Sequence, residues 1–155
     1  VQQHNWQQPL RGDWTVQLNE AVLAAPAPVV LVAHSLGCIL TAWWARHAPP
    51  AVVGKVQAAL LVAPGDVEQA DLRQHLPGWA PIARQRLPFA AVVVGSQNDP
   101  YCRLERAQQL AADWGAQWVD AGAAGHINSA SQLGDWPQGH ALLQDLVKDS
   151  VHGKR

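Results

Sequence analysis

Ser35 stands where an apolar run ends and an amphipathic helix begins, a position that suits a nucleophile. The run at 29–33 reads Val-Val-Leu-Val-Ala, and apolar residues then recur at helical spacing as far as His47. A sharp turn from strand to helix exposes the serine Oγ at the top of a parallel sheet and directs the next backbone N–H to the same point. The pattern therefore predicts a nucleophilic Ser35, with the N–H of Leu36 as an oxyanion donor.

The segment Ala-His-Ser-Leu-Gly at 33–37 is close to the pattern G-x-S-x-G and differs from it at Ala33, where alanine is the smallest substitute for glycine. The partial positive charge at the start of the following helix favours an anion near Ser35. The alternative interpretation is an ordinary buried strand whose serine caps the helix.

Two later loops offer an acid and a base. Asp99 follows an apolar run at 89–95, and His126 follows a short predicted strand at 117–120. Open parallel sheets bind ligands at the carboxyl ends of their strands, so we expect both loops to meet Ser35 there. Histidine can take the serine proton near neutral pH, and a carboxylate orients the imidazole. We predict a triad of Ser35, Asp99 and His126, with Asp120 as second choice for the acid.

Other candidate residues fit this chemistry less well. His34 is next to the serine, but neighbours at a strand end point to opposite faces, so we expect a packed or surface histidine rather than the base. Cys38 and Cys102 belong to no C-x-x-C pair and are expected to be reduced thiols. The seven histidines show no metal-binding spacing, and no glycine-rich nucleotide motif follows a strand. We therefore expect no metal and no cofactor.

Apolar strands alternate with amphipathic helices along the chain. Strands are predicted at 29–33, 56–63, 89–95 and 117–120, and helices at 13–25, 36–47, 103–114 and around 142–147. Strands that are apolar throughout are buried on both faces. We predict an α/β fold in a single domain at 1–155, with an α/β-hydrolase-like parallel sheet flanked by helices on both faces.

The segment 64–88 joins the second and third predicted strands and contains four prolines and little helical periodicity. Long connections of this kind in compact domains are usually functional or disordered. We interpret it as a small cap over the site, with Trp79 and Ile82 lining a substrate pocket. A surface crossover that packs Trp79 on the sheet edge is the equal alternative.

Composition excludes several function classes. Eleven basic and twelve acidic residues give a net charge of −1, and 48% of the residues are apolar. No basic stripe could follow a nucleic acid backbone, and no apolar run approaches the roughly 20 residues that cross a bilayer. We expect a cytoplasmic protein with a small-molecule substrate and neither a nucleic acid nor a membrane partner.

Three segments together resemble a known family. They are the elbow A-H-S-L-G at 33–37, the acid loop S-Q-N-D-P-Y-C at 96–102 and the base loop from G-H-I-N to G-D-W-P at 125–137. With them the chain resembles the small YdeN-like serine hydrolases of the α/β-hydrolase superfamily, the group that includes retinoblastoma-binding protein 9. The resemblance implies a triad at Ser35, Asp99 and His126 and activity on small esters. The L-x-C-x-E motif tied to the protein partner of that relative is not found here, so a protein partner is unsupported.

The family resemblance also implies an upstream first strand and a glycine-rich loop that supplies the second oxyanion donor. The chain begins on Val-Gln-Gln-His without a Met, and we expect this first strand to be missing. The function predicted from the sequence is hydrolysis of small carboxylic esters, thioesters or amides through an acyl-Ser35 intermediate. The alternative is a non-catalytic module that keeps the fold and binds a ligand or a protein.

Overall fold

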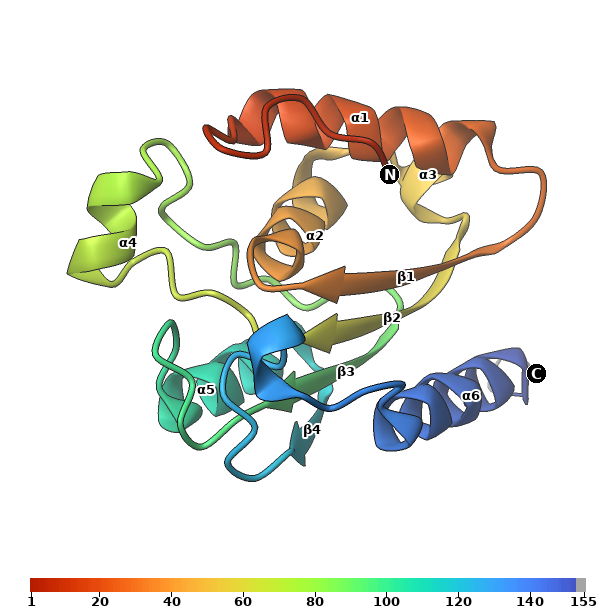
Figure 1. Cartoon of the computed structure of the whole chain (residues 1–155). Coiled ribbons are helices and arrows are strands. Elements are labelled where there is room, and N and C mark those ends of the chain that lie inside the picture. Colours follow the sequence, from red (N-terminus) through yellow and green to blue (C-terminus); the bar gives the residue numbers. More distant parts are fainter. Residues whose placement is uncertain (153–155) are drawn as a thin grey trace.

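Four parallel strands form one sheet in chain order, β1-β2-β3-β4, in the computed structural model, which describes residues 1–152 (Figure 1). The strands are β1 (Val29–His34), β2 (Val56–Val62), β3 (Ala90–Gly95) and β4 (Gln117–Asp120). The helices are α1 (Arg11–Ala24), α2 (Leu36–His47), α3 (Pro50–Val53), α4 (Ala70–His75), α5 (Leu104–Trp114) and α6 (Pro137–His152), with a 3₁₀ turn at Ser129–Ser131. These elements confirm the predicted fold class, a parallel sheet in an α/β arrangement.

The two central strands are buried on both faces because helices cover each side of the sheet. In β2 every residue except Gln57 is buried, which is why its sequence is almost continuously apolar. Helices α1, α2 and α5 share one hydrophobic cluster with Leu61 and Val93 of the sheet. Helix α6 covers the opposite face, where Leu146 packs with Leu60 and Val92 (Figure 1). The prediction of helices on both faces is confirmed.

The register of the sheet brings the carboxyl ends of the strands to one edge. His34 pairs with Val62, and Gly95 pairs with Asp120. The backbone hydrogen bonds of the sheet continue just beyond the strands, where the N–H of Ser35 donates to the Val62 carbonyl at 2.9 Å. The residues that follow β1, β3 and β4 therefore emerge at the same edge of the sheet.

The start of the first helix differs from the prediction, and the end of the second agrees with it. We expected Asp13 to cap the first helix, but the helix begins at Arg11 with Leu10 in the capping position, and Asp13 lies in the first turn. An acidic side chain there still interacts favourably with the helix dipole. The prolines after α2 end that helix as predicted, and Pro50 also starts α3, since proline suits the first position of a helix.

The segment 64–88 is held against the rest of the fold by buried aromatic packing and by ion pairs. The Trp79 indole N–H donates to the Pro9 carbonyl at 2.9 Å, and its ring packs edge-on against Trp14. Glu68 accepts hydrogen bonds from both Arg84 and Arg106, and Arg106 belongs to α5. The segment is thus attached to α5 before α4 and to the residues near the start of α1 after it. No helix within residues 1–152 is long and apolar enough to span a membrane.

Candidate active site

Ser35 occupies the strained turn between β1 and α2. Its backbone lies at φ 55° and ψ −115°, in a region that L-residues rarely adopt. Strain of this kind is concentrated at functional sites and persists because the surrounding structure enforces it. The Ser35 side chain makes no capping hydrogen bond to α2, which removes the alternative of a simple helix-capping serine. The hydroxyl is therefore free to interact across the sheet edge.

Ala33, which stands where the pattern G-x-S-x-G has glycine, lies close to Gly37 on the other side of the elbow. A Cβ built on Gly37 would lie 3.4 Å from the Ala33 Cβ, an ordinary van der Waals contact. The first residue of α2 is Leu36, and its N–H, like the other first N–H groups of a helix, has no partner within that helix.

His126 connects Ser35 to Asp99 by hydrogen bonds on its two ring nitrogens. The His126 Nε2 lies 2.8 Å from the Ser35 Oγ, and the His126 Nδ1 lies 2.9 and 3.0 Å from the two carboxylate oxygens of Asp99. The Asp99 side chain is 2% exposed and that of His126 is 10% exposed. A carboxylate can only accept, so Nδ1 carries the proton and Nε2 is left to accept from the serine hydroxyl.

Hydrogen bonds between the acid loop and the base loop hold Asp99 and His126 together. The Asn98 Oδ1 accepts from the Gly125 N–H at 2.7 Å, and the Ser96 Oγ accepts from the Ala124 N–H at 2.9 Å. The Ser96 hydroxyl donates to the same Asn98 oxygen. The acid loop thus positions the backbone that presents His126, a role that the residue types alone did not reveal.

Asp120, the second choice for the acid, makes other contacts. Its carboxylate accepts from the Gln97 amide at 3.1 Å and from the Gly122 N–H at 2.7 Å. These hydrogen bonds stabilise the turn after β4 and engage the Asp120 carboxylate within that turn. The structure brings Asp99, not Asp120, to His126.

Two rings flank His126. The His34 Nε2–H donates to the His126 carbonyl oxygen at 2.8 Å, and the two imidazole centroids are 4.7 Å apart. The Tyr101 ring packs edge-on against His126 at 4.6 Å. The prediction that His34 is a packed or surface histidine is consistent with its exposed position, but its contact with His126 was missed. The adjacency of His34 to Ser35 in sequence was the one available signal.

Two hollows open beside Ser35. The small hollow has a volume of about 130 Å³ and includes Ser35 and Leu36. Its other lining residues are Gly65, Val67, Leu72, Leu76, Tyr101 and His126. The large hollow, of about 430 Å³, lies along β1 on the other side of Ser35. It is lined by His34, Val32, Leu40, Trp14 and Trp6, among others.

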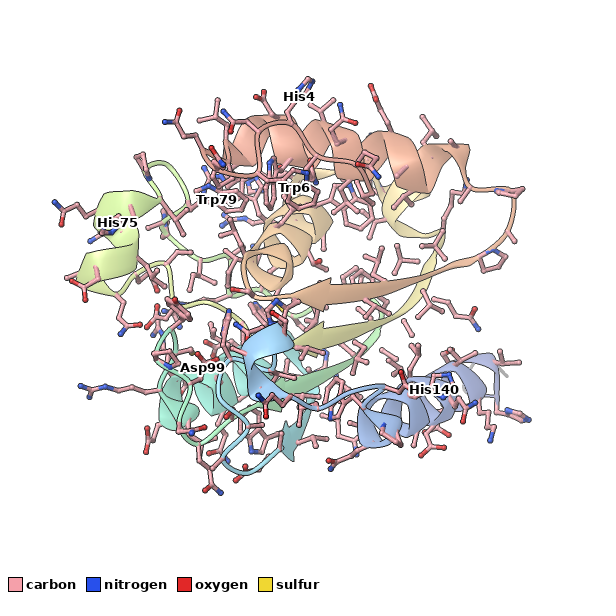
Figure 2. The ribbon with its side chains drawn as sticks, viewed as in Figure 1. His4, Trp6, His75, Trp79, Asp99 and His140 are labelled. Atoms are coloured by element: carbon pink, nitrogen blue, oxygen red, sulfur yellow. The ribbon has the colours of Figure 1, made fainter. Side chains whose placement is uncertain are left out.

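The structure corrects the predicted pocket lining at Trp79 and Ile82. Trp79 is fully buried and Ile82 is 4% exposed, and both belong to the hydrophobic core rather than to either hollow. Figure 2 shows Trp79 under α1, away from Asp99. Their apolar side chains fill the core beneath the segment 64–88, and Val67, Leu72 and Leu76 of the same segment face Ser35 instead. Hydrophobicity in the sequence does not distinguish side chains that fill the core from side chains that line the small hollow.

The two thiols are buried and protonated. Burial raises the pKa of Cys38 well above its usual range. Burial also raises the pKa of Cys102 to about 12, and the carboxylates of Asp66 and Asp99 add to that rise. Thiolate, not thiol, is the nucleophilic form, so these environments disfavour cysteine chemistry.

Three other histidines lie outside the triad. His4 and His140 lie on other sides of the molecule from Asp99 (Figure 2), and His75 of α4 lines a separate hollow with Pro100 and Tyr101. Over residues 1–152, no group of three or more His, Cys, Asp or Glu side chains could hold a metal ion.

A parallel sheet with a serine elbow after one strand, an acid after the third and a histidine after the fourth defines an α/β hydrolase. The family model described as "Serine hydrolase" matches residues 1–145, and the chain belongs to this family. No curated protein matches the chain.

Solved structures share the fold. A YdeN-like hydrolase from Pectobacterium atrosepticum is 24% identical, with a TM-score of 0.82 over 97% of this chain and 76% of its own. The ydeN gene product from B. subtilis is 18% identical, with a TM-score of 0.76 over 96% and 81%. An α/β-superfamily hydrolase from Xanthomonas campestris is 21% identical, with a TM-score of 0.59 over 88% and 69%. The expected resemblance to YdeN-like hydrolases is confirmed.

Proposed function

We propose that the protein hydrolyses small carboxylic esters, thioesters or amides through a covalent acyl-Ser35 intermediate. The observation that carries the proposal is the chain of hydrogen bonds from the Ser35 Oγ through the His126 imidazole to the Asp99 carboxylate, with 2.8 Å between Oγ and Nε2. A serine hydroxyl is a weak nucleophile until an adjacent base takes its proton, and this arrangement supplies the base and its orienting acid.

In the first half-reaction the Ser35 Oγ attacks the substrate carbonyl carbon while its proton passes to the His126 Nε2. The carbonyl π-electrons move onto oxygen, and in this proposal the Leu36 N–H donates to the oxyanion. Collapse of the tetrahedral intermediate breaks the bond to the leaving group, which takes the proton from Nε2. Asp99 stabilises the transient imidazolium and keeps its proton on Nδ1.

In the second half-reaction a water molecule replaces the leaving group. His126 takes a proton from the water as its oxygen attacks the acyl carbon, and Ser35 regains a proton when the ester bond breaks. The products are a carboxylic acid and the free enzyme. The strained backbone of Ser35 supports this role, because it projects Oγ away from α2 and into the open edge.

Labelling with a small fluorophosphonate probe tests the proposal. We expect the probe to modify the protein at one site, and we expect the Ser35→Ala and His126→Ala variants to lose labelling. Ser129→Ala is the matched control, because Ser129 lies in the exposed 3₁₀ turn of the base loop, and it should label normally. No labelling of the unmodified chain, or labelling that survives Ser35→Ala, would favour the non-catalytic binding module instead.

A further inference from the structure

Apolar side chains from the segment that joins β2 to β3 line the small hollow together with Ser35. Leu72 belongs to α4, Leu76 caps its carboxyl end, and Val67 is fully buried behind them. Among the described residues that line this hollow, none is Lys, Arg, Asp or Glu. A neutral, aliphatic group suits such a lining, because a charged group would lose its hydration without gaining a partner.

Gly65 connects the reacting atoms to the small hollow. A Cβ built on Gly65 would lie 3.3 Å from the Ser35 Oγ and 4.0 Å from the Leu36 backbone nitrogen. The attacked carbonyl group must occupy this space, because its carbon approaches Oγ and its oxygen approaches the Leu36 N–H. The absent side chain at Gly65 therefore leaves a direct opening from the carbonyl into the hollow.

The volume of the small hollow limits the length of the group that enters it. The hollow measures about 130 Å³, whereas pockets for drug-sized ligands span roughly 300–1,000 Å³. The small hollow is therefore less than half the size of such a pocket, which favours a short aliphatic chain over a drug-sized group.

We propose that the enzyme is selective for short, uncharged acyl groups bound in the small hollow. This inference rests on the proposed hydrolase function. Up to the length that fits, each additional buried methylene group improves transition-state binding by about fourfold. Longer chains extend past Leu72 and Leu76 and lose that gain.

A series of p-nitrophenyl esters from acetate to octanoate tests the acyl limit. We expect kcat/KM to be greatest between acetate and butyrate and to be at least tenfold lower for octanoate. An optimum at hexanoate or longer would overturn the inference.

Two variants change the hollow in opposite directions. Leu76→Ala should move the optimum by about two carbons toward longer chains, and Leu72→Phe should move it toward acetate. The control is Leu143→Ala, because Leu143 is a half-buried leucine of α6 that packs on the opposite face of the sheet. It should leave the order of the esters unchanged.

Fluorophosphonate labelling of each variant separates the two proposals. Normal labelling at Ser35 with a chain-length optimum that neither variant moves would refute the acyl hollow and leave the hydrolase function intact. Loss of labelling from the unmodified chain would refute the hydrolase function, and the acyl selectivity with it.

Discussion

Replacement of Gly65 by alanine should reduce catalysis without reducing stability. The added Cβ would lie 3.3 Å from the Ser35 Oγ and 3.9 Å from the Ser35 carbonyl carbon. Carbon atoms pack best at about 3.5–4.0 Å, and a near-attack substrate carbon must come within about 3–3.5 Å of Oγ. The methyl group and the substrate carbonyl therefore compete for the same space.

The expected loss of activity follows from that competition. A displacement of about 1 Å from productive geometry costs about 100-fold in rate. The contact at 3.3 Å requires a shift of only part of that, so we expect kcat/KM to fall about 10- to 100-fold, which equals about 1.4–2.7 kcal/mol of transition-state stabilisation. The substrate is p-nitrophenyl acetate, and progress is followed by release of p-nitrophenolate.

The stability of the same variant should be unchanged or slightly improved. Gly65 does not adopt the left-handed conformation that an alanine would resist. A glycine-to-alanine change at a compatible position stabilises a protein by about 0.4–1 kcal/mol through the unfolded chain. Urea unfolding measures this free energy separately from activity.

Gly12→Ala is the matched control. Gly12 lies in α1, and a Cβ built on it meets no atom within 4 Å. This variant should gain up to about 1 kcal/mol of stability and keep full activity. Full activity of Gly65→Ala, or an activity loss explained by unfolding, would refute the assignment of the carbonyl site to the space beside Gly65.

Three further predictions concern the surroundings of the site. Asn98→Ala removes the acceptor of the Gly125 N–H, so kcat should fall about tenfold. Asn98→Asp keeps an acceptor and should retain most of the activity. Equal kcat values for the two variants would contradict a positioning role for Asn98. Gly95→Ala places a Cβ against the Trp118 ring, closer than packed atoms allow, so unfolding by urea should show a loss of about 1–3 kcal/mol. An unchanged midpoint would contradict this packing. Iodoacetamide should modify neither Cys38 nor Cys102 in the folded protein at pH 8 and both in urea, because burial raises both pKa values. Unfolded thiols ionise at about pH 8.5, whereas the folded thiols stay neutral. The free energy of unfolding should therefore also fall as the pH rises above that point.

The meeting of Ser35, Asp99 and His126 could be predicted because it depends on a rule of topology. Each residue follows a predicted strand, and parallel strands end at one edge when helices connect them. The order of the strands and their register in the structure follow that rule, and the fold class was predicted correctly.

Other features of the site depend on contacts between distant segments and could not be predicted. Trp79 and Leu76 are three residues apart in one apolar stretch, yet one is core and the other faces the small hollow, because the path of the connection decides which side chain turns inward. Gly65 and His34 carry no motif. Their roles become visible only from their distances to Ser35 and His126.

Rapid mixing with p-nitrophenyl butyrate tests the central claim most directly. We expect a burst of about one p-nitrophenolate per chain, and peptide mapping after an acid quench should find the butyryl group on Ser35. The Ser35→Ala variant should show neither. Turnover without a burst or an acylated peptide, or a butyryl group on another residue, would contradict acyl transfer through Ser35.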